Sequence, residues 1–179
     1  MLAKLAGPFY ASMGGTVTDR TPTPSRLWKL MTAEQRLRAA TALWRDARAT
    51  NDQMQAAVLI AKQKNFRPKT VIGLDEDRKA RYLATVLELP EALAASVLIV
   101  YHMAEQRPMM GAFLDALGIP HENGMIQDDA VAPDPAKVAA AAAAIGKAYP
   151  AHDVSLYLNT LLWQDPAAWG ALRGTSEAV

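Results

Sequence analysis

The residues best suited to chemistry lie between positions 102 and 122. His102 and Glu105 are three positions apart in a segment of helical periodicity, so both side chains lie on one face of the helix. His121 and Glu122 follow in a loop, one short helix later. Imidazole and carboxylate groups in such a set can bind Zn²⁺ or another divalent ion. His102, Glu105 and His121 are therefore the candidate ligands of a metal site.

Two other interpretations of these residues stay open. In one, His102 and Glu105 bond to each other, or Glu105 pairs with Arg107, and the side chains only satisfy polar groups inside the protein. In the other, the pair serves as acid and base in a small enzyme. The sequence has neither H-E-x-x-H nor E-x-x-H, which disfavours zincins and di-iron bundles. Beyond this divalent ion, we predict no cofactor.

The loop at 118–124, Gly-Ile-Pro-His-Glu-Asn-Gly, carries three consecutive polar side chains. Pro120 stiffens it, and Asn123-Gly124 is a pair that accepts the positive φ angles of a tight turn. Loops of this kind often carry recognition. The alternative is a turn whose polar side chains bond its own backbone. In the first case the ligand-binding residues are His121, Glu122 and Asn123.

A helix that follows Pro90 must position His102 and Glu105. We predict that it ends near Arg107, because a proline at 108 disfavours helical geometry in the residue before it. Apolar residues cover most of its circumference, which is typical of a central, buried helix. Only His102, Glu105 and Gln106 interrupt that surface, as one narrow polar strip. A shorter helix at 109–117 is predicted next, with a glycine C-cap.

The sequence predicts an all-α fold. Of its 179 residues, 51% are apolar and 21% charged, as in a globular domain. Thr32, Asp75 and Asp134 mark helix starts, and no segment has the period-2 alternation of a strand. We predict an irregular N-terminal leader at 1–26 and a single helical domain at 27–173. Its antiparallel helical pairs are expected to form either a short HEAT-like superhelix or a closed helical bundle.

Three segments repeat the order helix, helix, short proline-initiated helix, at 27–73, 74–118 and 133–172. Arg67 and Arg107, each followed by proline, lie 40 positions apart, the length of HEAT or armadillo repeats. The step from Pro108 to Pro166, however, is 58 positions, which is not a regular array, so the superhelix and the bundle both stay open. Alternatively, any helical protein with prolines at its helix starts shows such similarities.

Composition excludes several classes of protein. The chain contains no cysteine, which excludes disulfides, thiol nucleophiles and thiolate metal ligands. No apolar run reaches the roughly 18–20 residues of a membrane-spanning helix, so no membrane segment is expected. Gly7-Pro8 interrupts the short apolar start of the chain, which disfavours a secretory signal. We therefore expect a cytoplasmic protein.

The net charge of +1 conceals an uneven distribution along the chain. Residues 1–70 hold 12 Lys and Arg against 4 Asp and Glu, whereas residues 71–179 hold 7 against 14. A basic half can bind nucleic acid or another polyanion. Its cations, however, are spread along helices and are not interleaved with exposed aromatic residues, and charge runs are most often solvated faces.

The leading functional hypothesis is a cytoplasmic, non-enzymatic helical interaction or regulatory module that binds a protein partner or a second copy of itself. It rests on the lack of a phosphate-binding loop, nucleophile elbow, dinucleotide fingerprint or EF-hand loop. The first alternative is a small enzyme or a metal- or ligand-binding protein, with a site at His102, Glu105, Arg107, His121, Glu122 and Asn123. The second alternative is polyanion binding by the basic N-terminal half.

Overall fold

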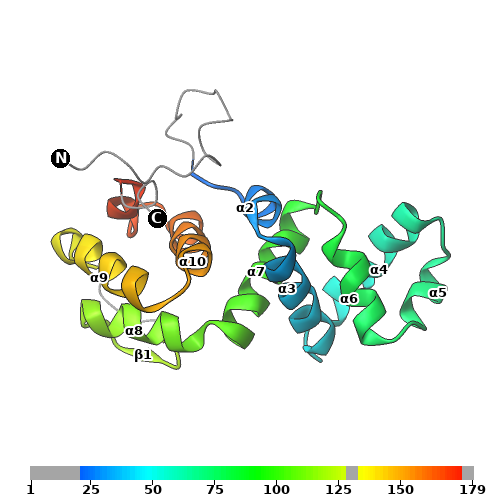
Figure 1. Ribbon diagram of the computed structural model, residues 1–179, viewed down its shortest axis with the longest axis horizontal. Coiled ribbons are helices and arrows are strands. Elements are labelled where there is room, and N and C mark those ends of the chain that lie inside the picture. The colour runs from blue at the N-terminus through cyan, green and yellow to red at the C-terminus, as the bar shows by residue number, and fades with distance from the viewer. Residues whose placement is uncertain (1–20, 128–132, 175–179) are drawn as a thin grey trace.

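The computed structural model describes residues 21–127 and 133–174, and these are mostly helical (Figure 1). The all-α prediction is confirmed. No helix within these ranges is long and apolar enough to cross a lipid bilayer. The elements are α2 (Pro24–Leu30), α3 (Ala33–Arg45), α4 (Thr50–Lys64), α5 (Pro68–Ile72), α6 (Glu76–Ala84), α7 (Glu91–Glu105), α8 (Arg107–Leu117), β1 (His121–Glu122), β2 (Met125–Ile126), α9 (Pro135–Ala148), α10 (Ala151–Gln164) and the 3-10 helix η1 (Gly170–Gly174).

Helix ends follow local capping signals. Thr32 and Gln35 form a complete capping box at the start of α3, and each accepts the backbone N–H of the other. The side chains of Asp75 and Asp134 cap α6 and α9. Gly118 ends α8 in the left-handed conformation, with φ 69°. These predicted boundaries are confirmed.

Two predicted boundaries are wrong. The helical periodicity that begins at Ala33 predicts a helix to about Ala49. Helix α3 instead ends at Arg45, because Asp46 accepts the backbone N–H of Arg48 and forms a local turn that competes with the helix. The leader was expected to extend to residue 26, but α2 already begins at Pro24, where a proline suits the first helical turn. The rest of the leader prediction, at 1–20, lies outside the described residues.

A hairpin interrupts the helical chain after α8. Strands β1 and β2 pair antiparallel, with His121 opposite Ile126. The two residues between them, Asn123 and Gly124, have φ angles of 51° and 84°, as a type I′ turn requires. The expectation that the chain has no strand is therefore wrong, since strands of two residues are too short to show alternation.

The buried apolar side chains form two clusters. The first fills the N-terminal lobe, α2 to α7, around Trp28, Leu43 and Leu83. The second fills the C-terminal lobe, α8 to α10 with η1, around Phe113 and Leu158. Figure 1 shows the same division: α4, α5 and α6 lie toward one end of the elongated molecule, α8, α9 and η1 at the other, and α7 lies between them. The choice between a superhelix and a closed bundle stays a prediction.

Helix α7 is not buried on nearly all sides, as the sequence suggested. Leu93, Val97 and Tyr101 are buried, but Ile99 is 43% exposed and Ala104 is also exposed. The buried face packs against α2 and α3. Nothing in the described chain covers the opposite face, so this helix presents apolar side chains to solvent.

Candidate functional site

His102 is a core residue at the junction of α7 and α10. Its side chain is 4% exposed, and its Nε2 lies 3.0 Å from Thr160 Oγ1. The Thr160 hydroxyl donates to the Leu156 carbonyl, so it accepts the Nε2–H of His102. Nδ1 is then an acceptor that is buried without a partner among the described residues. Burial lowers the pKa of His102 to about 4, and the ring is therefore neutral at pH 7.

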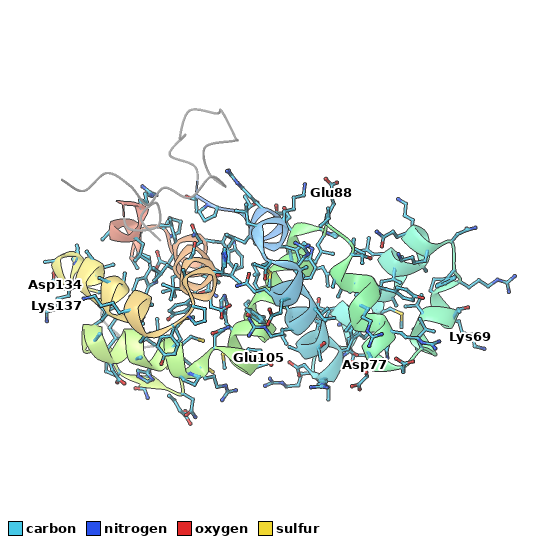
Figure 2. All side chains as sticks on the ribbon, viewed as in Figure 1. Lys69, Asp77, Glu88, Glu105, Asp134 and Lys137 are labelled. Atoms are coloured by element: carbon cyan, nitrogen blue, oxygen red, sulfur yellow. The ribbon has the colours of Figure 1, made fainter. Side chains whose placement is uncertain are left out.

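Glu105 and Arg107 do not join His102. Glu105 is exposed at the end of α7, near the middle of the molecule (Figure 2), and has no hydrogen bond or ion pair among the described residues. Arg107 donates its Nε–H to the Met103 carbonyl at 2.6 Å instead of pairing with Glu105. The predicted polar strip is thus divided: His102 and Gln106 are buried, whereas Glu105 faces water.

The side chain of His121 forms hydrogen bonds to its own hairpin and to α8. Its Nδ1 accepts the Gly124 backbone N–H at 3.1 Å, so its Nε2 carries the proton and donates to Asp115 Oδ1, also at 3.1 Å. Both ring nitrogens are therefore occupied within the loop and α8. This arrangement matches the alternative in which the loop bonds its own backbone. Glu122 and Asn123 lie exposed on the hairpin.

The structure does not assemble the predicted metal set of His102, Glu105 and His121. Within the described ranges, no group of three or more His, Asp or Glu side chains lies close enough to hold a metal ion. The physical reason is that His102 is bonded inside the core, Glu105 is on the surface and His121 is bonded to α8. Helical spacing places His102 and Glu105 on one face of α7, but the rest of the protein covers only His102.

The hairpin predicts a sharp contrast between two glycines. A Cβ added at Gly124 would lie 2.6 Å from the Cβ of Met110, at a φ of 84° that side chains rarely adopt. We expect Gly124→Ala to lower the free energy of unfolding by about 2 kcal/mol. Gly146 lies within α9, and a Cβ added there would have no atom of another segment within 4 Å. Gly146→Ala should therefore raise the free energy of unfolding by about 0.5–1 kcal/mol. Urea denaturation measures both, and equal effects would contradict the geometry.

A concave site that the sequence did not reveal lies between α3 and α7. It has a volume of about 380 Å³. Its apolar lining residues, which we call the floor, are Ala42 from α3 and Ile99, Val100, Met103 and Ala104 from α7. We call it the α3–α7 groove. The signal for it was present in the sequence as Ile99 and Met103, at helical spacing on one face, but that pattern is usual for core residues.

Charged side chains also line the groove, and we call them the rim. Arg45 comes from the end of α3, Arg48 follows in the next turn, and Arg107 comes from the start of α8. Two carboxylates also line the groove. That of Asp46 is bonded to Arg48, and this hydrogen bond lowers its pKa; Glu105 is the other. The rim therefore carries three guanidinium groups against two carboxylates.

A buried polar cluster joins the two lobes beside this groove. Asp153, at the start of α10, is 6% exposed. It accepts hydrogen bonds from Gln35 Nε2 at 2.7 Å and Tyr101 Oη at 3.1 Å, and it pairs with Arg38 at 3.4 Å. We call this set the Asp153 cluster; Gln106 supports it through a hydrogen bond to Tyr101 Oη. Sequence patterns do not reveal this cluster, because its members come from three separate helices.

The Tyr101 hydroxyl remains protonated over the whole neutral range. Burial, together with the charge of Asp153, raises its pKa to about 12. Tyr101 is therefore a permanent donor to Asp153, and its ring lies 5.6 Å from the Arg38 guanidinium carbon. The Asp153 cluster is suited to holding α3, α7 and α10 together, since its central groups are already bonded to one another.

Comparison with known proteins does not narrow the function. The chain matches no protein-family model, no curated protein and no solved structure. The functional argument therefore depends on the geometry of the α3–α7 groove and on the charged surfaces of the molecule.

Proposed function

We propose that this protein is a non-enzymatic interaction module whose α3–α7 groove binds an acidic, amphipathic segment of a partner protein. The observation that supports this most directly is a solvent-open groove that is lined both by apolar side chains and by three arginines. An amphipathic helix places apolar side chains on one face and charged ones beside it, so it matches both parts of such a groove.

The floor supplies the apolar part of the argument. Ile99 is a large aliphatic residue on a regular helix, yet it is 43% exposed. Met103, one turn later, lines the same groove, and the flexible methionine side chain adapts to differently shaped partners. A partner that covers this floor removes apolar surface from water, which favours association by about 25 cal/mol per Å².

The rim supplies the charge complementarity. Arg107 has no carboxylate partner within the described ranges, because its Nε–H is directed to a backbone carbonyl. Arg45 makes only a long ion pair, 3.8 Å, with the exposed Glu76. Guanidinium groups bind carboxylates in paired hydrogen bonds, so an acidic segment suits this rim better than a basic one.

The geometry gives less support to the enzyme alternative. The nitrogen of His102 that bears the proton is bonded to Thr160, both ring nitrogens of His121 are occupied, and Glu105 is an isolated carboxylate. An acid and a base that act together need to lie within reach of one substrate. A cytoplasmic location stays a prediction from the sequence.

A designed peptide tests the proposal. A fluorescent helix of about 20 residues with leucine every three or four positions and glutamate beside them should bind, and its lysine counterpart should bind more weakly. Ile99→Asp should weaken binding by about ten-fold or more, because it places a carboxylate in the floor. Fluorescence anisotropy measures each affinity, and circular dichroism checks the fold.

Leu87→Asp is the matched control. Leu87 is 52% exposed and does not line the groove, so the same substitution there adds the same charge to another apolar surface position. Binding should be unchanged in this variant. The proposal fails if the glutamate peptide does not bind saturably, or if both aspartate variants weaken it equally.

A further inference from the structure

A second charged surface lies at the far end of the N-terminal lobe, away from the groove. Four cations, Lys62, Lys64, Arg67 and Lys69, lie within eight residues at the junction of α4 and α5. Figure 2 shows Lys69 at this end of the molecule. Between positions 53 and 74 the sequence has no Asp or Glu. We call this surface the basic tip.

The cations of the basic tip are not neutralised by the protein. None of the four forms an ion pair among the residues that the structure describes, whereas other cations of the same lobe do, as in Lys29–Glu88 and Arg78–Asp75. The nearest acidic run in the sequence begins α6, and Figure 2 shows its Asp77 apart from Lys69. The tip therefore presents uncompensated positive charge.

An exposed aromatic ring lies among these cations. Asn65 ends α4 in the left-handed conformation, with φ 55°, and Phe66 follows it directly. The Phe66 residue is 40% exposed, and its ring makes a T-shaped contact with the ring of Tyr82, with 6.1 Å between centroids. Lys64 lies over Tyr82, 5.3 Å from the ring centre. The sequence-based expectation that these cations lack an exposed aromatic neighbour is wrong here.

We propose that the basic tip binds single-stranded nucleic acid, with Lys62, Lys64, Arg67 and Lys69 on phosphates and Phe66 stacked on a base. Proteins that bind single strands combine cations along the backbone with aromatic side chains under the bases. An anionic membrane fits the tip less well, because surface binding to lipid needs a sizeable amphipathic helix, and α5 has five residues. This site is separate from the α3–α7 groove, so either assignment can fail alone.

The salt dependence of binding gives the first test. The full chain is titrated into a fluorescein-labelled oligo-dT of about 12 nucleotides, and anisotropy is followed. Four phosphate contacts predict a slope of about −3 for log affinity against log salt, hence a loss of about 50-fold between about 50 and 200 mM NaCl. Lys62→Gln with Lys69→Gln should reduce the slope to about −1.4.

Two further variants separate this site from general attraction. Phe66→Ala should weaken binding by about ten-fold and leave the salt slope unchanged, because it removes stacking and no charge. Lys137→Gln with Lys147→Gln removes the same charge from exposed positions on α9 and should change neither quantity. The proposal is overturned if the α9 variant acts like the tip variant, or if the oligonucleotide shows no salt-sensitive binding. In a parallel titration with phosphatidylserine vesicles, binding to the vesicles without binding to the oligonucleotide would also overturn the proposal.

Discussion

Asp153→Ala is expected to lower the free energy of unfolding by about 3 kcal/mol, because removing this buried carboxylate leaves two buried hydrogen-bond donors without an acceptor. The Gln35 amide and the Tyr101 hydroxyl both donate to Asp153 inside the protein, and Arg38 pairs with it. For a chain of this length, such a loss corresponds to a decrease in Tm of about 6–12 °C. Thermal and urea denaturation, followed by circular dichroism, measure it.

Asp77→Ala is the control for this prediction. Asp77 is an exposed residue of the first turn of α6, where a carboxylate stabilises the helix by only about 0.3–1 kcal/mol through the helix dipole. Tyr101→Phe should fall between the two, at about 1 kcal/mol, since it removes one donor and keeps the ring. A loss below about 1 kcal/mol for Asp153→Ala would contradict the importance given to the Asp153 cluster.

The stability of the protein should decrease in acid through His102. The unfolded chain protonates this residue near pH 6.5, but burial lowers its pKa to about 4 in the folded protein. Between these values the unfolded state binds the proton and the folded state does not, so stability falls as the pH falls. Over the whole interval the loss is about 3 kcal/mol, which urea denaturation at about pH 7 and about pH 4.5 detects in large part.

His102→Leu should remove this part of the pH dependence. Thr160 keeps its bond to the Leu156 carbonyl in that variant, and the unpartnered Nδ1 is eliminated, so we expect little loss at neutral pH. His152→Gln changes an exposed histidine and should keep the acid sensitivity of the original chain. If His102→Leu retains the same difference between neutral and acid pH, another group is responsible.

The parts of the fold that sequence predicts well depend on neighbouring residues. The capping box of Thr32 and Gln35 and the side-chain caps of Asp75 and Asp134 involve groups at most three positions apart. A short stretch of sequence therefore contains both partners of each interaction. The turn at Asp46 is equally local, but it lies within a continuous helical pattern, and periodicity gave the wrong helix end.

The candidate sites depend on contacts between distant segments, which periodicity does not contain. Thr160, the partner of His102, is 58 positions away, and Gln35 is 118 positions from Asp153. Spacing correctly placed His102 and Glu105 on neighbouring parts of one helix. It did not say which would meet a hydrogen-bonding partner from α10. The same limit applies to Ile99, which the pattern marks as apolar without indicating that no segment covers it.

Helix α7 contributes both to the α3–α7 groove and to the contact between the two lobes. Ile99 and Met103 line the groove, while Tyr101 and His102 connect to α10 on another face of the same rod. A partner that shifts α7 on entering the groove necessarily changes the strength of its attachment to the C-terminal lobe. By thermodynamic reciprocity, a change in that attachment alters the affinity for the partner by the same factor. Helix α7 therefore links the binding of a partner in the α3–α7 groove to the relative arrangement of the two lobes.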